Sequence, residues 1–575
     1  MRTHLPKSLL GGVIAVGALV AAIAPVAARS GGPSKDGGAL TSINHIVVIY
    51  EENHSFDNLY GSWGKVRGEA VDGRSSADVA HTTQVAQDGT AYTCLLQNDV
   101  NLTSPSPLPA TCSDPRPAVG NTAFTNNPFA IDAYVPSSAT TCPAPGTFAA
   151  HGVPNGQGEP GGCTEDLVHR FYQEQYQLDH GQQDRYVTGS DAVGLTMGYY
   201  DSTQLPIYQY LHSGDAPRYT IADNFFQGAF GGSFLNHQYL IAAQAPVWSG
   251  GAVNNGTSTD LHSIVDTNGM PNNYPLYAAT GTVKDSRLTA SCSPSSGTPS
   301  ANDSSVPCGD YAINTIQPTY QPFAPGTSTA NKLPPIPPAA SGYNNIGDAM
   351  NAANVDWAWY SGGWSNADGE VGAPGWTEGT AGPCSSAAAS GAVWPNCPDK
   401  NFQFHHQAFN YFANYAPGTA NRAAHLRDEQ EFIDSAKAGT LKPVSFIKPV
   451  GDENEHPGYA SEPNGSQHLV DLIKAIEDGP NAKDTLIVVS YDEFGGQWDH
   501  MSPPGQGNND GPHDAFGPGT RVPALLISPR LDRGVDHTEH DTTSIIATIE
   551  HRFGLAPISS RDATVADLSS ALKKN

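Results

Sequence analysis

Two short apolar runs, each ending in a pair of metal-ligating side chains, constrain this sequence most. The first run, residues 44–53, reads NHIVVIYEEN and ends in Glu52 and Asn53. The second, residues 484–493, reads DTLIVVSYDE and ends in Asp492 and Glu493. Apolar, β-branched runs of this length between polar turns are typical of strands buried on both faces. Ligands of open α/β sheets bind beyond the carboxyl ends of such strands, so the sequence predicts that both pairs meet around one divalent metal ion.

Acidic residues at strand ends are also common as solvated surface residues, and this alternative applies to either pair alone. The segments that follow favour the metal site. Glu52 opens the run Glu-Asn-His-Ser-Phe-Asp57, and Asp492 opens a run that closes at His500, so both are dense in oxygen and imidazole groups.

Other periodic segments indicate the fold class. Residues 219–222, 443–448 and 522–528 are predicted strands, and residues 467–477 and 540–553 are predicted helices. Strands that alternate with helices predict an α/β fold with a mostly parallel sheet. We predict one catalytic domain over residues 43–575, with loop insertions at about 88–165 and 282–343. Decorative surface loops and a lid over the site are both open interpretations of the insertions.

The amino terminus is typical of an exported protein. Arg2 and Lys7 precede an apolar stretch at residues 9–23 that is too short to span a bilayer comfortably. Residues 1–28 are therefore predicted to be a signal peptide cleaved near Ala28, and residues 29–42 a flexible linker. No other segment reads as a transmembrane anchor, which favours a secreted or periplasmic location.

The eight cysteines fall as sequence neighbours. An even count in an exported chain indicates disulfides, and local pairing is the simplest of about 105 connectivities. It would join Cys94 to Cys112, Cys142 to Cys163, Cys292 to Cys308 and Cys384 to Cys397. No C-x-x-C pattern occurs, which weighs against a zinc ribbon or a redox enzyme.

The formal net charge of −27 limits the partners of the chain. Such a surface repels nucleic acid and anionic bilayers, so no nucleic acid is expected as a stable partner. An anionic substrate would need local compensation from a metal ion or from a helix amino terminus.

Ser233 is a candidate nucleophile. It follows a predicted strand ending near Ala222 and the Gly231-Gly232 turn, at the expected N-cap of a helix running to about Gln244. Unpaired backbone N–H groups at such a position bind phosphate and stabilise an alkoxide, more so beside a metal ion. The alternative is that the serine only caps the helix, which is a common use of serine.

Four of the twenty histidines are candidates for acid catalysis or for contacts to the non-bridging oxygens of a phosphate. They are His169, His406, His456 and His500. His456 and His500 stand out because each lies a few residues beyond a predicted strand end. A structural or surface role is the alternative for each of them.

Several familiar motifs are absent or misplaced. Residues 156–161 fit G-x-G-x-x-G but include a proline and follow no strand. The sequence has no Walker A loop, no H-E-x-x-H and no G-x-S-x-G elbow, which weighs against lipases of the ordinary type and thermolysin-like proteases.

Seven motifs occur in a fixed order along the chain. They are Glu52-Asn-His-Ser-Phe-Asp57, Thr196-Met-Gly-Tyr-Tyr200, Asp223-Asn-Phe-Phe226, Ser233-x-x-Asn236, Glu455-His-Pro457, Asp492-Glu-x-Gly-Gly-x-x-Asp-His500 and Val522-Pro-Ala-Leu-Leu-Ile-Ser-Pro529. Together they resemble the bacterial phosphoesterase family that contains phospholipases C and acid phosphatases. The resemblance runs from about Ile46 to Leu555.

The resemblance implies an alkaline-phosphatase-like α/β fold, a three-layer sandwich around a mostly parallel sheet. It implies that Glu52, Asn53, Asp492 and Glu493 bind the metal and that Ser233 is the nucleophile. His169 and His456 match active-site histidines, and His406 matches less distinctively. Two positions depart from the family pattern, since His54 and His237 stand where arginine is usual. A guanidinium grips phosphate bidentately and an imidazole does not, so these departures bear on substrate orientation.

The sequence therefore predicts an exported, metal-dependent phosphoric-ester hydrolase, with an acid phosphatase of broad specificity as the first hypothesis. Hard oxygen donors favour Ca²⁺, Mg²⁺, Mn²⁺ or iron as the metal. The first alternative is a phospholipase C acting on phosphatidylcholine-type lipids, and the second is a secreted binding protein with an inactive site. The run Phe404-His-His-Gln-Ala-Phe-Asn-Tyr-Phe-Ala-Asn-Tyr415 looks more like the acid-phosphatase branch.

Overall fold

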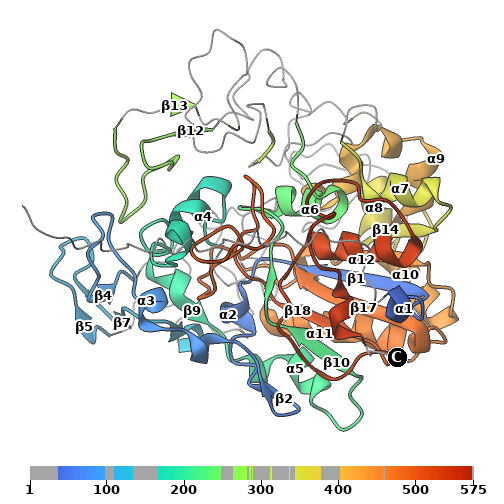
Figure 1. Cartoon of the computed structure of the whole chain (residues 1–575), viewed down its shortest axis with the longest axis horizontal. Helices are drawn as coiled ribbons and strands as arrows, with labels where there is room; N and C mark the ends of the chain where they lie inside the picture. Colours follow the sequence, from blue (N-terminus) through green and yellow to red (C-terminus); the bar gives the residue numbers. More distant parts are fainter. Residues whose placement is uncertain are drawn as a thin grey trace, which may run out of the picture.

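A central sheet of eight strands organises the computed structural model of the chain (Figure 1). The structure describes residues 37–97, 109–133, 166–247, 263–281, 284–285, 288, 311–313, 336, 343–376, 402–457 and 460–572. The predicted signal peptide lies outside the described residues. Within them, every helix is too short or too polar to cross a membrane.

The sheet order is β15-β14-β16-β1-β17-β18-β10-β19. Its strands, in that order, are Leu426–Asp428, Trp357–Ser361, Val444–Lys448, His45–Glu51, Thr485–Tyr491, Ala524–Ile527, Tyr219–Ala222 and Gly534–Asp536. All neighbours pair in parallel except that β18 runs antiparallel to both β17 and β10. The predicted α/β class with a mostly parallel central sheet is confirmed.

Helices cover both faces of this sheet (Figure 1). α6 and α12 lie on one face, and α5, α10 and α11 lie on the other. The α-helices are α1 Gly37–Leu40, α2 Phe56–Leu59, α3 Val79–Thr82, α4 Phe171–Leu178, α5 Pro206–Leu211, α6 Ser233–Ala242, α7 Ile346–Ala352, α8 Trp364–Asp368, α9 Ala420–His425, α10 Glu429–Ala438, α11 Glu462–Glu477 and α12 Thr543–Phe553.

Two-residue strands form six small ribbons around this frame. They pair β2 Lys65–Val66 with β3 Glu69–Ala70, β4 Cys94–Leu95 with β7 Phe124–Thr125, β5 Cys112–Ser113 with β6 Asn121–Thr122, β8 Phe129–Ala130 with β9 Gly198–Tyr199, β11 Phe225–Phe226 with β20 His540–Asp541, and β12 Ile264–Val265 with β13 Lys284–Asp285.

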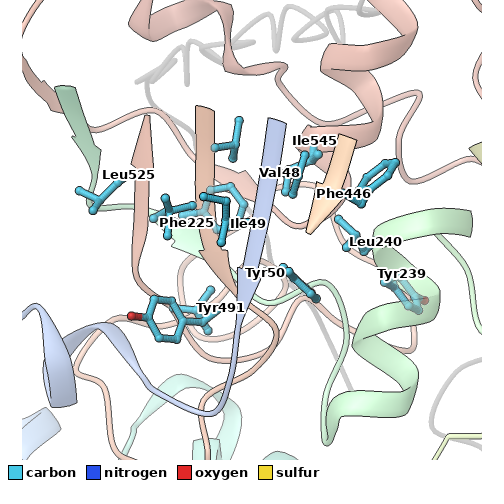
Figure 2. Close-up of a cluster of buried hydrophobic side chains, with 14 of the residues drawn as sticks. Val48, Ile49, Tyr50, Phe225, Tyr239, Leu240, Phe446, Tyr491, Leu525 and Ile545 are labelled. Atoms are coloured by element: carbon cyan, nitrogen blue, oxygen red, sulfur yellow. The ribbon is translucent and has the colours of Figure 1, made fainter. Parts of the chain in front are cut away.

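Apolar side chains from β1 fill the space between the sheet and the helices. Val48 and Phe446 point from neighbouring strands toward Ile545 of α12, and Tyr50 lies toward Leu240 of α6 (Figure 2). All five side chains are essentially inaccessible to water. Full burial of one such side chain contributes about 1.5–3 kcal/mol to the stability of the fold. This apolar layer therefore holds α6 against the sheet.

Three predicted helix boundaries are wrong, each for a local reason. α11 begins at Glu462 and not at residue 467, because Ser461 caps it and Pro463 fits the first turn, which needs no N–H from that residue. α12 begins at Thr543 and not at residue 540, because His540–Asp541 pair as β20 with β11. α6 ends at Ala242, since Ala243 adopts a left-handed conformation.

The predicted linker and insertions are only partly described. Residues 37–40 form α1, and Leu40 is buried, so the folded part of the described chain starts before residue 43. A disulfide joins Cys94 to Cys112, as local pairing predicts. The other six cysteines lie outside the described residues, as does most of the second insertion.

Candidate metal centre and active site

The pairing of β1 with β17 brings the two ligand-rich pairs together. Glu51 is opposite Tyr491 in the parallel register, so Glu52 and Asp492 leave the sheet side by side. Hydrogen bonds from two backbone N–H groups then join the segments that follow the two strands. The N–H of Asp492 donates to Glu51 O at 3.1 Å, and the N–H of Asn53 donates to Asp492 Oδ1 at 3.1 Å.

Four side-chain oxygens of this group are buried without a bond of hydrogen-bonding geometry among the described residues: Glu52 Oε1, Asn53 Oδ1, Asp492 Oδ2 and Glu493 Oε1. Their side chains are at most 1% exposed. The backbone holds the second oxygens of Asp492 and Glu493, since Asp492 Oδ1 accepts from Glu493 N at 2.8 Å and Glu493 Oε2 from Gly495 N at 2.7 Å. The unpaired oxygens therefore keep a fixed orientation, as ligands of a divalent cation do.

Burial also makes the negative charge of this group costly. It raises the pKa of Glu52, Asp492 and Glu493 above their ordinary values, and the charge of Asp492 raises the pKa of the other two further. Carboxylates so placed need a compensating positive charge. The donor set thus fits a hard divalent metal ion.

Ser233 points at this group. Its Oγ donates to Glu52 Oε2 at 3.1 Å. The sequence placed Ser233 at the N-cap of α6, and this was wrong by one residue, because Gly232 is the N-cap and Ser233 the first helical residue. The residue at the cap position is a glycine without a side chain, and the Ser233 hydroxyl is directed to Glu52 instead. The interpretation of Ser233 as a simple cap is therefore wrong.

A buried carboxylate that the sequence analysis missed holds the turn before Ser233. Glu174 of α4 accepts hydrogen bonds from Gly231 N at 2.5 Å, from Gln227 Nε2 at 2.9 Å and from Thr520 N at 2.7 Å. Gly231 has φ +92°, and a Cβ there would come within 2.5 Å of the backbone of Phe171. Burial raises the pKa of Glu174 to about 7. No sequence signal separates Glu174 from other helical glutamates.

His169 and His456 lie on either side of Asn53. The Asn53 Nδ2 atom is 3.4 Å from His169 Nε2 and 3.0 Å from His456 Nε2. Each Nδ1 faces a backbone carbonyl, of Leu167 at 2.6 Å and of Pro457 at 2.5 Å. A carbonyl only accepts, so both Nδ1 atoms carry hydrogen and both Nε2 atoms face the site. His169 Nε2 is also 3.5 Å from Glu493 Oε1.

His406 and His237 line the Glu52 side of the site. His406 Nε2 is 3.2 Å from Glu52 Oε1, and His237 Nε2 is 3.8 Å from the same oxygen. The two rings stack with centroids 4.8 Å apart. Burial holds the pKa of both imidazoles well below the ordinary value, so both are neutral.

Lys448 is a second residue that the sequence analysis missed. It ends β16, the other neighbour of β1, and its Nζ contacts Glu52 Oε1 and donates to Tyr50 O at 2.9 Å. The sequence contained a signal for Lys448, because it is the basic last residue of a predicted central strand. Such a residue is expected at the same edge of the sheet as the ligand pairs. Its ammonium partly offsets the charge of the carboxylates.

Two histidines from the sequence analysis lie apart from Ser233. His54 contacts Asn58 Oδ1 at 2.5 Å and Glu455 O at 2.9 Å, and burial lowers its pKa to about 4. His500 Nδ1 is 2.5 Å from Asp57 Oδ2, within an ionic cluster that includes Arg521. The structure does not bring His500 into contact with the predicted metal ligands.

Comparison with known proteins identifies the family of the chain. A sequence profile of the Phosphoesterase family matches residues 43–556. The chain is 32% identical over 167 residues to phospholipase C B of Mycobacterium tuberculosis, 29% over 163 residues to non-specific phospholipase C6 of Arabidopsis thaliana, and 31% over 163 residues to non-hemolytic phospholipase C of Pseudomonas aeruginosa. These alignments cover 23–24% of this chain and 24–31% of the relatives.

A solved protein of the alkaline phosphatase superfamily from Vibrio parahaemolyticus overlaps 40% of this chain and 52% of its own, with 12% identity and a TM-score of 0.23. An overlap of that extent supports no conclusion about activity. The profile match spans most of the chain, and this protein therefore belongs to the phosphoesterase family, a family named for the hydrolysis of phosphoric esters.

Proposed function

We propose that this protein is a metal-dependent phosphoric-ester hydrolase in which Ser233 is the nucleophile. The contact of 3.1 Å between Ser233 Oγ and Glu52 Oε2 carries the proposal, because it joins a hydroxyl to the buried ligand group. Glu52, Asn53, Asp492 and Glu493 would hold a hard cation such as Ca²⁺, Mg²⁺, Mn²⁺ or iron. When bound, such a cation stabilises an alkoxide and the developing charge on phosphoryl oxygens.

The side chains of the site suit an in-line displacement. Ser233 Oγ forms a bond to phosphorus while the bond to the leaving oxygen breaks, and the hydroxyl proton passes to Glu52 Oε2, which accepts its hydrogen bond. Water then attacks the phosphorylated serine and restores the hydroxyl, which releases phosphate from a monoester or the headgroup phosphate from a phospholipid. Ser233 lies in the first turn of α6, where backbone N–H groups without helical partners stabilise phosphoryl oxygens.

His169 and His456 are the proposed acids for the leaving oxygen. Their Nε2 atoms face the ligand group, and the carbonyls at Nδ1 fix the orientation of both rings. Protonation at Nε2 makes either ring a donor to the departing oxygen. His406 and His237 are neutral and lie beside Glu52, which suits them to contact phosphoryl oxygens and not to neutralise them.

Two substrate classes are consistent with this chemistry. The strongly acidic composition and the segment Phe404 to Tyr415 support a phosphatase of broad specificity on soluble monoesters, of the acid-phosphatase type. The names of the curated relatives support a phospholipase C instead. An inactive secreted binding protein is disfavoured, because it has no reason to keep buried, unpaired ligand oxygens.

Replacing Ser233 with alanine tests the nucleophile. Ser233→Ala removes the only atom that bonds to phosphorus, so kcat on p-nitrophenyl phosphate or on a phospholipid is expected to fall by about 10⁴-fold or more. Circular dichroism and bound metal should be unchanged. The matched control is Ser213→Ala, an exposed serine before β10, which should keep full activity. Full activity in Ser233→Ala would exclude the covalent route.

Metal removal tests the ligand group. Dialysis against a chelator is expected to abolish turnover, because the buried carboxylates lose their compensating charge. Added Mn²⁺ or Ca²⁺ should restore turnover. Asp492→Asn should not be restored by the same additions. Asp356→Asn, whose side chain is 61% exposed, is the control and should behave like the parent protein. Undiminished turnover after verified metal loss would contradict the proposal.

A comparison of two substrates separates the hypotheses on specificity. A phosphatase should hydrolyse p-nitrophenyl phosphate with a higher kcat/KM than micellar phosphatidylcholine, and a phospholipase C should show the reverse order and release diacylglycerol. Both activities should disappear together in Ser233→Ala, since one nucleophile serves either substrate. Hydrolysis of neither ester by the metal-loaded protein would leave the inactive binding protein as the better hypothesis.

Glu174→Gln tests the support of the nucleophile turn. The amide would turn an N–H group toward backbone donors that now share a carboxylate, so the turn at Gly231 should shift. Small displacements of a reacting group cost up to about 10²-fold in rate, so kcat should fall by that order with KM little changed. Metal content should not change, and Glu69→Gln, whose side chain is 51% exposed, is the control. A change in KM alone would indicate a different role.

A further inference from the structure

A second group of acidic side chains lies on the other face of the sheet from Ser233. Side chains alternate along a strand, so Glu51 points away from the face where Tyr50 reaches Asn236 of α6. Around Glu51 gather side chains from α10, from α11 and from the loop after β16. The carboxylates of this group are Glu51, Glu429, Glu453, Glu455 and Glu462, and His468 is its imidazole.

Three of these side chains are arranged as ligands of one ion. One atom each from Glu429, Glu453 and His468 lies within 4.8 Å of the other two. His468 Nε2 is 3.0 Å from Glu429 Oε1 and 3.7 Å from Glu453 Oε2. Ligands that share a cation at about 2.0–2.2 Å lie at such separations. His468 Nε2 makes no bond of hydrogen-bonding geometry to a described residue, although Glu429 is so near.

Glu51 provides an independent sign of a missing partner. Its side chain is inaccessible to water, and both of its carboxylate oxygens are without a hydrogen-bond partner in the described part of the chain. It interacts electrostatically with Glu429 and His468, so its charge adds to that of the same group. Glu429 Oε2 is also buried without a partner there. A buried carboxylate that accepts no hydrogen bond is costly unless a cation stands beside it.

Two basic side chains interact electrostatically with Glu51, namely Lys448 and His468. They do not balance the negative charge of the carboxylates in this group. The Lys448 ammonium is directed to Glu52 and to the carbonyl of Tyr50. His468 is left to face several carboxylates. A divalent cation would supply the charge that is lacking, and solvent can reach the position because the Glu453 side chain is 40% exposed.

We propose that Glu429, Glu453 and His468 bind a second divalent cation, whose charge would offset that of the buried Glu51 carboxylate. Carboxylates with one imidazole suit Mn²⁺ or Zn²⁺. This ion would tie α10 and α11 to the loop after β16 and would offset the negative charge at the end of β1. It would brace Glu52, the next residue after Glu51, and the loop that carries Glu453 and His456. The second site is thus structural support for the catalytic edge and lies outside it.

Counting bound cations tests the proposal without any measurement of turnover. The full-length protein is stripped of metal, loaded with Mn²⁺, dialysed and analysed by plasma mass spectrometry. Two Mn²⁺ ions are expected per chain in the parent protein and in Ser233→Ala. One is expected in His468→Ala, in Glu429→Gln and in Asp492→Asn, and none in a chain that combines His468→Ala with Asp492→Asn.

Two further variants guard against an unfolded protein. Glu453→Gln changes a partly exposed ligand, and it should weaken Mn²⁺ binding at the second site at least tenfold while the circular dichroism spectrum is retained. Asp471→Asn, on the exposed side of α11, is the matched control and should bind two ions. One ion in the parent protein, or two in a folded His468→Ala, would overturn the proposal. A parent protein that binds two ions but hydrolyses no phosphoester would contradict only the proposed function.

Discussion

Buried negative charge at the carboxyl ends of β1 and β17 is the constraint on which the rest of the structure depends. The parallel register sets Glu52 beside Asp492, and neither side chain is accessible to water. Buried carboxylates of this kind need a positive charge beside them. The strand order β16-β1-β17 supplies part of the positive charge, because β16 lies on the side of β1 opposite β17 and places Lys448 next to Glu52. The three adjacent strands β16, β1 and β17 thus determine the positions of the candidate metal site and the candidate nucleophile.

The alternation of side chains along β1 extends this argument to both faces of the sheet. Successive residues Glu51 and Glu52 leave the strand end in opposite directions, one toward α11 and one toward Ser233. Two consecutive glutamates therefore concentrate charge on both sides of one peptide. An ion on either side lowers the cost of the other carboxylate, since the two are separated only by the backbone. The two proposed ions would therefore couple the stability of the strand end to the chemistry of the site through that peptide.

Patterns that are local in sequence were predictable. The β-branched runs identified β1 and β17, and the glycine turn before an apolar segment identified Ser233 and α6. Contacts that depend on tertiary packing were not. Glu174 supports Gly231 from a distant helix, and Lys448 reaches Glu52 only because β16 is its neighbour. His500 looked equivalent to His456 in sequence, yet Asp57 holds it in a different cluster. Proximity to a strand end predicts the edge of the sheet but not the direction of a side chain.

Asn53 shows why an amide suits one position among the acidic ligands. Its backbone is left-handed, with φ 60°, a conformation that asparagine tolerates better than most residues. In this conformation its N–H bonds to Asp492 while its Nδ2 lies within reach of His169 and His456. A carboxylate could not donate to two imidazole lone pairs, and it would add a further buried charge. The amide therefore orients both rings at Nε2 before either is protonated and still leaves Oδ1 for the proposed cation, so the proposed metal binding and acid catalysis would share one side chain.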